Sequence, residues 1–130
     1  MGFEDRVAIV TGGRRGIGRA IACLLAERGA SIVIADREYE QALETATQIS
    51  ATSGRRALAI STDVSNPGSA QELIDKTIAE FNRIDILVNN AGVPAPLPEG
   101  DSPSSMDNTF DKVDRALWKR YVDVNIYGVM

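Results

Sequence analysis

A glycine-rich segment near the start of the chain has the residue types and the spacing to hold a pyrophosphate. Residues 11–18 read Thr-Gly-Gly-Arg-Arg-Gly-Ile-Gly, between a short apolar run and an amphipathic stretch. Glycines let a backbone approach a ligand closely, and the helix that follows offers free N–H groups and the positive end of its dipole. An ordinary turn is the alternative, but a glycine cluster between a strand and a helix favours a dinucleotide site, with Arg14 among the candidate cofactor residues.

An acidic residue stands where such a site needs one. Asp36 ends the second apolar run, 18 residues after Gly18. A carboxylate there can accept hydrogen bonds from both hydroxyls of an adenosine ribose, although a solvated loop acid is the alternative. Arg15 and Arg37 offer different chemistry, because a guanidinium matches a 2′-phosphate that Asp36 would repel. We therefore predict NAD as the cofactor and leave NADP open.

Polar residues also follow the third and fourth apolar runs. Asp63-Val64 comes after the third run, where the carboxylate could reach an adenine amino group or simply cap a helix. The segment Asn89–Gly92 (Asn-Asn-Ala-Gly) follows the fourth run. In open α/β sheets, ligands bind at the carboxyl ends of the strands. The sequence therefore predicts one site along that edge.

Periodicity indicates the elements that position these residues. Short apolar runs predict four strands buried on both faces, at Arg6–Val10, Ser31–Ala35, Ala57–Ser61 and Ile84–Val88. Three amphipathic stretches between them predict helices, and connections of this length require parallel neighbours and right-handed crossovers. The fold expected over residues 1–130 is a single α/β domain, a three-layer doubly wound Rossmann-like sheet with strand order 3-2-1-4.

Each predicted helix has boundaries and a set of regularly spaced residues. The first extends from Ile17 to Arg28 and stops at Gly29, and the second covers Glu38 to about Ser50. The third begins at Asn66, a good cap, followed by Pro67. In the first helix the residues at helical spacing are Ile17, Ala20, Ile21, Leu24, Leu25 and Arg28. In the second, Ala42, Ala46 and Ile49 are expected to face inward, and in the third, one apolar face consists of Ala70, Leu73, Ile74, Ile78 and Phe81.

The last third of the chain departs from this alternation. Val93–Asn108 carries four prolines and three serines, which predicts a loop. Phe110–Met130 has helical spacing, with Phe110, Val113, Leu117, Tyr121 and Val124 on one face. No strand follows this helix.

Composition excludes several classes of protein. With 44% hydrophobic and 25% charged residues, the 130-residue chain is typical of a soluble globular domain, and it has no apolar run long enough to span a membrane and no secretory signal. A net charge of -4 without a basic block argues against nucleic-acid or anionic-membrane partners. The lone Cys23 favours a reducing cytoplasm, and the absence of histidine excludes a histidine triad or histidine metal site within this chain, so no metal site is predicted.

Taken together, the motifs resemble those of the short-chain dehydrogenase/reductase family, in particular its 3-oxoacyl-carrier-protein reductases. The resemblance implies hydride transfer between a nicotinamide cofactor and a small alcohol or ketone, in an enzyme that forms homo-oligomers. By family position, Asn89 braces the sheet, and Asn125 in Val-Asp-Val-Asn-Ile-Tyr-Gly matches a catalytic asparagine that kinks a helix and holds a proton-relay water. The resemblance also implies that the residues lining the cofactor's pyrophosphate are Gly12, Arg15, Gly16, Ile17 and Gly18. It implies that Asp36 holds the adenosine ribose and that Asp63 and Val64 hold the adenine. The nicotinamide-side ribose would be held by Asn90 with its neighbours Ala91 and Gly92.

The chain departs from that family in one respect. The family's acid/base centre is a serine followed by Tyr-x-x-x-Lys, in which the lysine lowers the tyrosine pKa. Tyr39 and Tyr121 have Leu43 and Asn125 four residues on, and Tyr127 has only three residues after it. The chain therefore resembles the N-terminal half of such an enzyme, and we expect these 130 residues to be inactive alone. Two other interpretations stay open: a non-catalytic nucleotide-binding module, and a methyltransferase, which the Thr11–Gly18 spacing disfavours.

Overall fold

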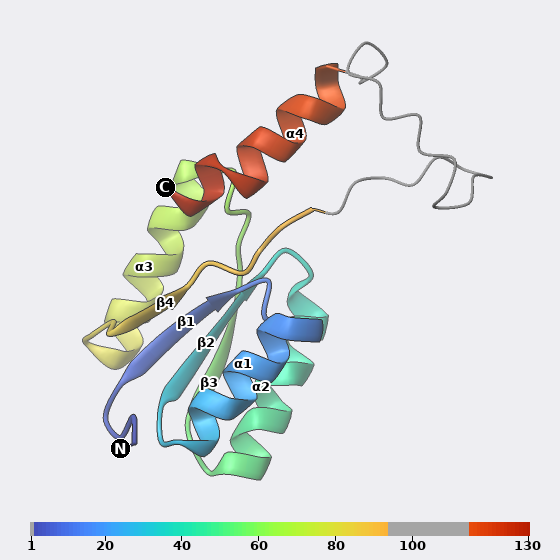
Figure 1. Cartoon of the computed structure of the whole chain (residues 1–130). Helices are drawn as coiled ribbons and strands as arrows, with labels where there is room; N and C mark the ends of the chain where they lie inside the picture. Colours follow the sequence, from blue (N-terminus) through green and yellow to red (C-terminus); the bar gives the residue numbers. More distant parts are fainter. Residues whose placement is uncertain (1, 94–114) are drawn as a thin grey trace, which may run out of the picture.

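A four-stranded parallel sheet lies at the centre of the computed structural model, which describes residues 2–93 and 115–130 (Figure 1). Its strands stand in the order β3-β2-β1-β4, which confirms the predicted 3-2-1-4 order. Helices alternate with the strands along the chain. The elements are β1 (Val7–Thr11), α1 (Gly16–Glu27), β2 (Ser31–Asp36), α2 (Tyr39–Ser53), β3 (Ala57–Ser61), α3 (Pro67–Phe81) and β4 (Ile86–Val88).

The sheet has a buried core on each face, as a three-layer fold requires. Helices α1 and α2 cover one face, and α3 lies on the other (Figure 1). Alternate residues of the central strands point to opposite sides, so that Ile34 joins the core under α1 and α2 while Val33 joins the core under α3. Both side chains are fully buried, which explains why these strands read as continuous apolar runs.

The helix boundaries follow from local signals. The Asn66 side chain accepts a hydrogen bond from the backbone N–H of Ser69, with Pro67 at the first helical position, as predicted for α3. Gly29 has a positive φ of 106° just after α1, and Gly54 one of 69° just after α2. Helix α2 extends three residues beyond its predicted end, because Gly54 rather than Ser50 terminates it.

Only part of the regularly spaced set in α1 packs toward the sheet, where Leu25 is partly buried against the core. The buried residues are Gly18, Ala22 and Ala26, whereas Ile17 is 75% exposed and Leu24 is 50% exposed. The helix approaches the sheet through its small residues, because the large side chains of β1 and β2 already fill the space beneath it. Periodicity located the helix, but the size of the side chains decides which face lies against the sheet.

The face of α3 was predicted only in part. Leu73 is buried as expected, but Ile74 and Ile78 are 36% and 42% exposed. Thr77 is instead fully buried, and its hydroxyl donates to the Leu73 carbonyl at 2.7 Å, which satisfies the polar atom inside the core. In α2, by contrast, Ala42, Ala46 and Ile49 are all buried as predicted.

The predicted helix to Met130 was also wrong at its end. Helix α4 (Arg115–Asn125) stops at Asn125, and a 3-10 turn, η3 (Tyr127–Val129), follows. Gly128 is a poor helix former, and a Cβ there would lie 2.8 Å from a methyl group of Val64, so this turn lies directly against the segment after β3. The predicted loop from residue 94 onward and the start of the predicted helix lie outside the described residues. No helix among residues 2–93 and 115–130 is long and apolar enough to cross a membrane.

Candidate functional site

A cleft of about 540 Å³ lies at the carboxyl ends of the strands. The turns after β1, β2, β3 and β4 form most of its wall, and one side of α4 completes it. Its lining consists of Gly12, Arg14, Arg15, Gly16, Ile17, Ala35, Asp36, Arg37, Glu38, Thr62, Asp63, Val64, Asn90, Ala91, Gly92, Val93, Arg120 and Val124. Every cofactor residue predicted from the sequence is in this set except Gly18.

Gly18 does not line the cleft but packs against two residues that do, Gly12 and Asn90. It is buried at the start of α1, and a Cβ there would lie 2.4 Å from the Asn90 side-chain nitrogen and 2.6 Å from the Gly12 carbonyl oxygen. A glycine at this position therefore lets α1 and the end of β4 approach each other closely.

Gly16 has a different role, because it faces open space. Its φ is 57°, and no protein atom would lie within 4 Å of a Cβ built on it. It is the first residue of α1 and lines the cleft, so the N–H groups of the first turn of the helix are directed toward that space. The space that a side chain would occupy here is therefore available to a ligand.

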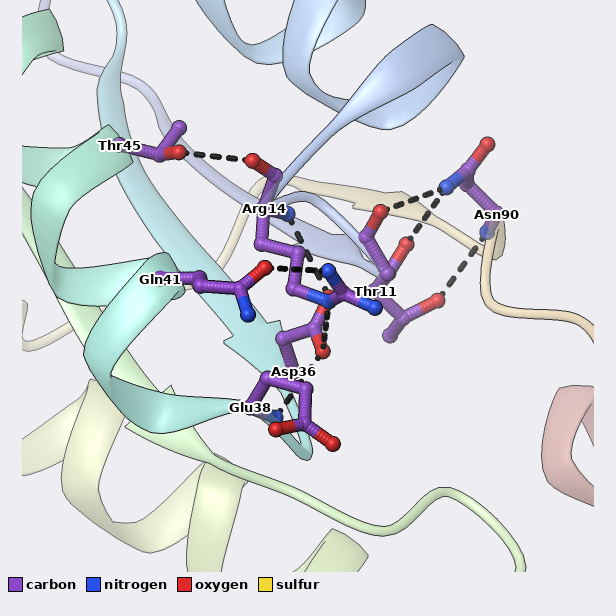
Figure 2. Close-up of polar contacts among 8 residues, drawn as sticks. Thr11, Arg14, Asp36, Glu38, Gln41, Thr45 and Asn90 are labelled. Carbon is purple, nitrogen blue, oxygen red and sulfur yellow. Dashed lines mark hydrogen bonds and ion pairs between the residues drawn. The ribbon is translucent and has the colours of Figure 1, made fainter.

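Asp36 and Arg14 form an ion pair on the cleft wall (Figure 2). The Arg14 Nε donates to Asp36 Oδ1 at 3.2 Å, and the two side chains are 17% and 10% exposed. The backbone N–H of Glu38 also donates to Asp36 Oδ1, at 3.2 Å. Among the described residues, the other carboxylate oxygen receives a single long hydrogen bond of 3.4 Å, from the Arg14 backbone N–H, and it can still accept one from a ligand.

Thr11 and Asn90 fasten the end of β4 to the end of β1 (Figure 2). The Thr11 hydroxyl accepts from the backbone N–H groups of Asn90 and Ala91, and the Asn90 amide donates to the carbonyls of Thr11 and Gly12 at 3.0 and 3.1 Å. Asn89 was expected to brace the sheet, but its side chain is exposed and makes no hydrogen bond to the described residues. Asn90 performs that task and also lines the cleft.

Asp63 lies at the third strand end with its pKa held below the usual range. The Ser65 hydroxyl, which donates to Asp63 Oδ1 at 2.6 Å, is the main cause, and the positive charges of Arg37 and Arg120 add to it. The carboxylate is therefore ionised throughout the neutral range. Its Oδ2 has no hydrogen-bond partner within the part of the chain that the structure describes.

Asn125, the predicted catalytic residue, is outside the cleft lining. Its Oδ1 accepts from the backbone N–H of Val93 at 3.0 Å, and its Nδ2 donates to the Val93 carbonyl at 3.4 Å. In this structure it joins the end of α4 to the segment that follows β4. A helix end lies at this residue, where the resemblance implied a kink.

Sequence reasoning missed six residues of the lining. Ala35, Glu38, Thr62 and Val93 are next to predicted residues at the strand ends, so extending each motif by one position would have found them. Arg120 and Val124 lie one helical turn apart on α4, and only the packing of that helix places them at the cleft. Arg120 adds a fourth arginine to a lining with three carboxylates, although the chain as a whole is acidic.

Comparison with known proteins identifies the family that shares this arrangement. The family model described as short chain dehydrogenase matches residues 6–130. The chain belongs to the short-chain dehydrogenase family. The match covers all four strands, the glycine-rich turn and α4, so every part of the cleft falls within it.

Individual relatives agree with this assignment. The chain is 39% identical over 127 residues to a cis-4-hydroxycyclohexanecarboxylate dehydrogenase of Sinomonas cyclohexanicum, covering 98% of this chain and 46% of the relative. Among solved structures it resembles a 3-ketoacyl-(acyl-carrier-protein) reductase from Brucella melitensis complexed with NADH, with a TM-score of 0.82, 30% identity, and coverage of 98% of this chain and 47% of that one.

An alcohol dehydrogenase from Thermococcus sibiricus complexed with 5-hydroxy-NADP is similar as well, with a TM-score of 0.83 and 27% identity. That match covers 95% of this chain and 48% of the solved one. This short-chain dehydrogenase sequence thus spans about half the length of these relatives.

Proposed function

We propose that the cleft holds the adenosine and pyrophosphate of a nicotinamide dinucleotide, and that the protein is an NAD(P)-dependent oxidoreductase acting on a small alcohol or ketone. The observation that carries the proposal is the open space at Gly16 beside the first turn of α1, with a carboxylate at the end of β2. Relatives solved with NADH and with 5-hydroxy-NADP support the cofactor class.

The donor set of the cleft fits such a cofactor. The N–H groups of the first turn of α1 suit a pyrophosphate, and the less occupied Oδ2 of Asp36 suits a ribose hydroxyl. The ionised Asp63, with Oδ2 free of described partners, suits the amino group of an adenine. Asn90, Ala91 and Gly92 line the part of the cleft beside α4, where the nicotinamide-side ribose is expected. When bound, the nicotinamide supplies or accepts the hydride.

Asp36 leads us to propose NAD as the preferred cofactor. A carboxylate at this position accepts hydrogen bonds from ribose hydroxyls and repels a phosphate in their place. Asp36→Ala is therefore expected to weaken NADH binding by about 1–3 kcal/mol, because it leaves a ribose hydroxyl without its acceptor. NADPH binding should stay the same or improve. A wild-type protein that prefers NADPH tenfold would refute this assignment.

We propose further that these 130 residues bind the cofactor but catalyse no turnover alone. No tyrosine in the chain has a lysine four residues on, so the proton exchange that accompanies hydride transfer lacks its group here. This keeps the non-catalytic nucleotide-binding module as the second candidate. The homo-oligomer, the cytoplasmic location and the catalytic role of Asn125 stay predictions of the resemblance and the composition.

Two matched glycine variants test the site. Gly16 and Gly54 both have positive φ, and a Cβ at either would meet no protein atom within 4 Å, but only Gly16 lines the cleft. Gly16→Val and Gly54→Val should each lose at least about 1 kcal/mol of stability from backbone strain. Only Gly16→Val should abolish NADH binding in a fluorescence titration, with far-UV circular dichroism mostly unchanged in both. Unchanged NADH binding by Gly16→Val would show that this turn is not the phosphate site.

A further inference from the structure

Helix α4 brings to the cleft a cation that has no partner among the described residues. Arg120 and Val124 lie one helical turn apart on α4, and both line the cleft. Val124 is buried, whereas Arg120 is exposed and forms no hydrogen bond or ion pair within the part of the chain that the structure describes. The neighbouring Lys119, by contrast, is paired with Asp123 at 2.5 Å and lies outside the lining. The position of Arg120 therefore suits contact with a ligand in the cleft.

The end of α4 is fastened at two strand ends, which fixes where Arg120 stands. Asn125 accepts from the Val93 backbone N–H at 3.0 Å, just after β4. Gly128 in η3 lies against Val64, just after β3, where a Cβ on this glycine would be 2.8 Å from a Val64 methyl carbon. This end of α4 lies beside the start of α3, at the edge where the strands end (Figure 1). Arg120, just over one turn before Asn125, is therefore held at the end of the cleft that Val64 lines.

The same end of the cleft holds one fixed hydrogen-bond acceptor. Asp63 Oδ1 accepts from the hydroxyl and the backbone N–H of Ser65, at 2.6 and 3.0 Å, and the Asp63 backbone N–H donates to the Ser69 hydroxyl at 2.9 Å. These contacts orient the carboxylate and leave Oδ2 without a partner among residues 2–93 and 115–130. The charge of Arg120 contributes to the lowered pKa of Asp63, although no ion pair joins these two described residues. Both groups are therefore available to a ligand.

An amino-substituted aromatic base fits this combination. Its amino group can donate to Asp63 Oδ2, and its flat ring can pack against the methyl groups of Val64 and Val124. A guanidinium is planar and weakly hydrated, so it can stack on the face of such a ring. A pyrophosphate fits less well here, because the N–H groups that suit it belong to the turn after β1, two strand spacings or about 10 Å from the end of β3.

We propose that Arg120 is a cofactor-binding residue: its guanidinium covers the adenine base of the bound dinucleotide, while Asp63 Oδ2 accepts the amino group of that base. Helix α4 thereby supplies one wall of the adenine site. NAD and NADP share the adenine, so Arg120 strengthens the binding of both to the same extent. This inference rests on the proposed function, since it concerns the adenine of that same cofactor.

The test compares the wild-type protein with Arg120→Ala and Lys119→Ala, which each remove one positive charge from α4 and introduce a good helix former. NADH and NADPH are titrated by their fluorescence, and adenosine, which carries no phosphate, is measured by its displacement of NADH. Arg120→Ala should weaken the binding of NADH and of adenosine about tenfold, within the range of a stacked cation, and that of NADPH by the same factor as NADH. Lys119→Ala should bind all three as the wild type does, because Lys119 lies outside the cleft lining.

The possible outcomes separate this inference from the proposed function. If the wild-type protein does not bind NADH, the proposed function fails and the inference fails with it. If Arg120→Ala weakens NADH but not adenosine, or NADPH more than NADH, Arg120 attracts phosphate and does not cover the base, so the inference alone is overturned. It is also overturned if adenosine does not displace NADH from the wild type, if Arg120→Ala binds NADH and adenosine normally, or if Lys119→Ala shows the same losses.

Discussion

Strands β2 and β4 are held to β1 by different means (Figure 1). Strand β2 lies between β1 and β3, and Ile32, Val33 and Ile34 are fully buried, with helices on both faces. Strand β4 pairs with β1 only from Ile86 to Val88, and the side chain of Leu87 between them is 53% exposed. Apolar burial therefore accounts for the position of β2 but only in small part for that of β4.

Polar contacts at both ends hold β4 instead. At its start, Asp85 accepts from the Val7 backbone N–H at 2.9 Å and from Arg83 and Arg6. At its end, Thr11 accepts from the backbone N–H groups of Asn90 and Ala91. One wall of the cleft is thus supported by a packed core and the other by directional hydrogen bonds, which predicts different responses to mutation.

The largest effect is expected in the core beneath β2. Ile34→Ala removes a fully buried side chain and should lower the free energy of unfolding by about 2–5 kcal/mol, because both transfer free energy and packing are lost. Leu87→Ala is the matched variant on β4 and should cost far less. Urea denaturation of both variants measures the difference, and similar losses would show that β4 is held by burial after all.

The next effect concerns the polar contacts at the end of β4. Thr11→Val keeps the side-chain shape but strands the N–H groups of Asn90 and Ala91, and should lower stability by about 1–3 kcal/mol. Because those residues line the cleft, NADH affinity should fall as well. Thr47→Val is the control, since Thr47 is exposed on α2 and bonds only within its own helix. A Thr11→Val protein with wild-type stability would contradict the polar attachment of β4.

The difference between β2 and β4 also marks what could be predicted from the sequence. The strand order could be predicted from the alternation of apolar runs and amphipathic stretches. The cleft residues could be predicted because glycines or acidic residues follow these runs, and parallel strands bring their carboxyl ends to one edge of the sheet. The pairing of Arg14 with Asp36 could not be predicted, nor could the attachment of β4 to β1 through Asn90 rather than Asn89. Both contacts join residues that are 22 or more positions apart in the sequence, so they depend on the packing of the folded chain. The face of α1 that lies against the sheet, through Gly18, Ala22 and Ala26, could not be predicted either, because the spacing of apolar residues does not show how closely a helix approaches its sheet.

The contacts of Asp85 that hold the start of β4 to β1 should depend on pH. The bidentate contact from Arg83, with further donors from Val7 and Arg6, holds the pKa of Asp85 well below its ordinary value. A lowered folded-state pKa means that this stabilisation is fully present above the unfolded value, near 4, and is lost as the pH falls toward the folded value. Asp85→Asn should therefore lower the melting temperature at pH 7, and the gap to the wild type should narrow below about pH 4. A gap that stays constant from pH 7 to pH 3 would show that charge is not the cause.

The smallest effect on stability, and the clearest effect on association, is expected at the outer face of β4. Its outer edge pairs with no strand among the described residues, and Leu87 is half exposed on the same side of the sheet as the exposed Ile74 and Ile78 of α3. An open strand edge beside apolar side chains is a template for pairing with another chain. We predict that these 130 residues, expressed alone, self-associate and are of marginal stability.

Leu87→Lys places a charge on that edge and should reduce association while changing the free energy of unfolding by no more than about 0.5 kcal/mol, because the side chain is already half in water. Leu43→Lys on α2, where the side chain is 41% exposed, adds the same single positive charge away from the edge and controls for net charge. Light scattering across a concentration series measures the association of each protein. A wild-type chain that stays monomeric and melts cooperatively above about 60 °C would contradict the prediction, since it would match a complete mesophilic domain. If both variants associate less than the wild type to the same extent, the overall charge is the cause. If only Leu87→Lys associates less, the outer edge of β4 is the contact surface.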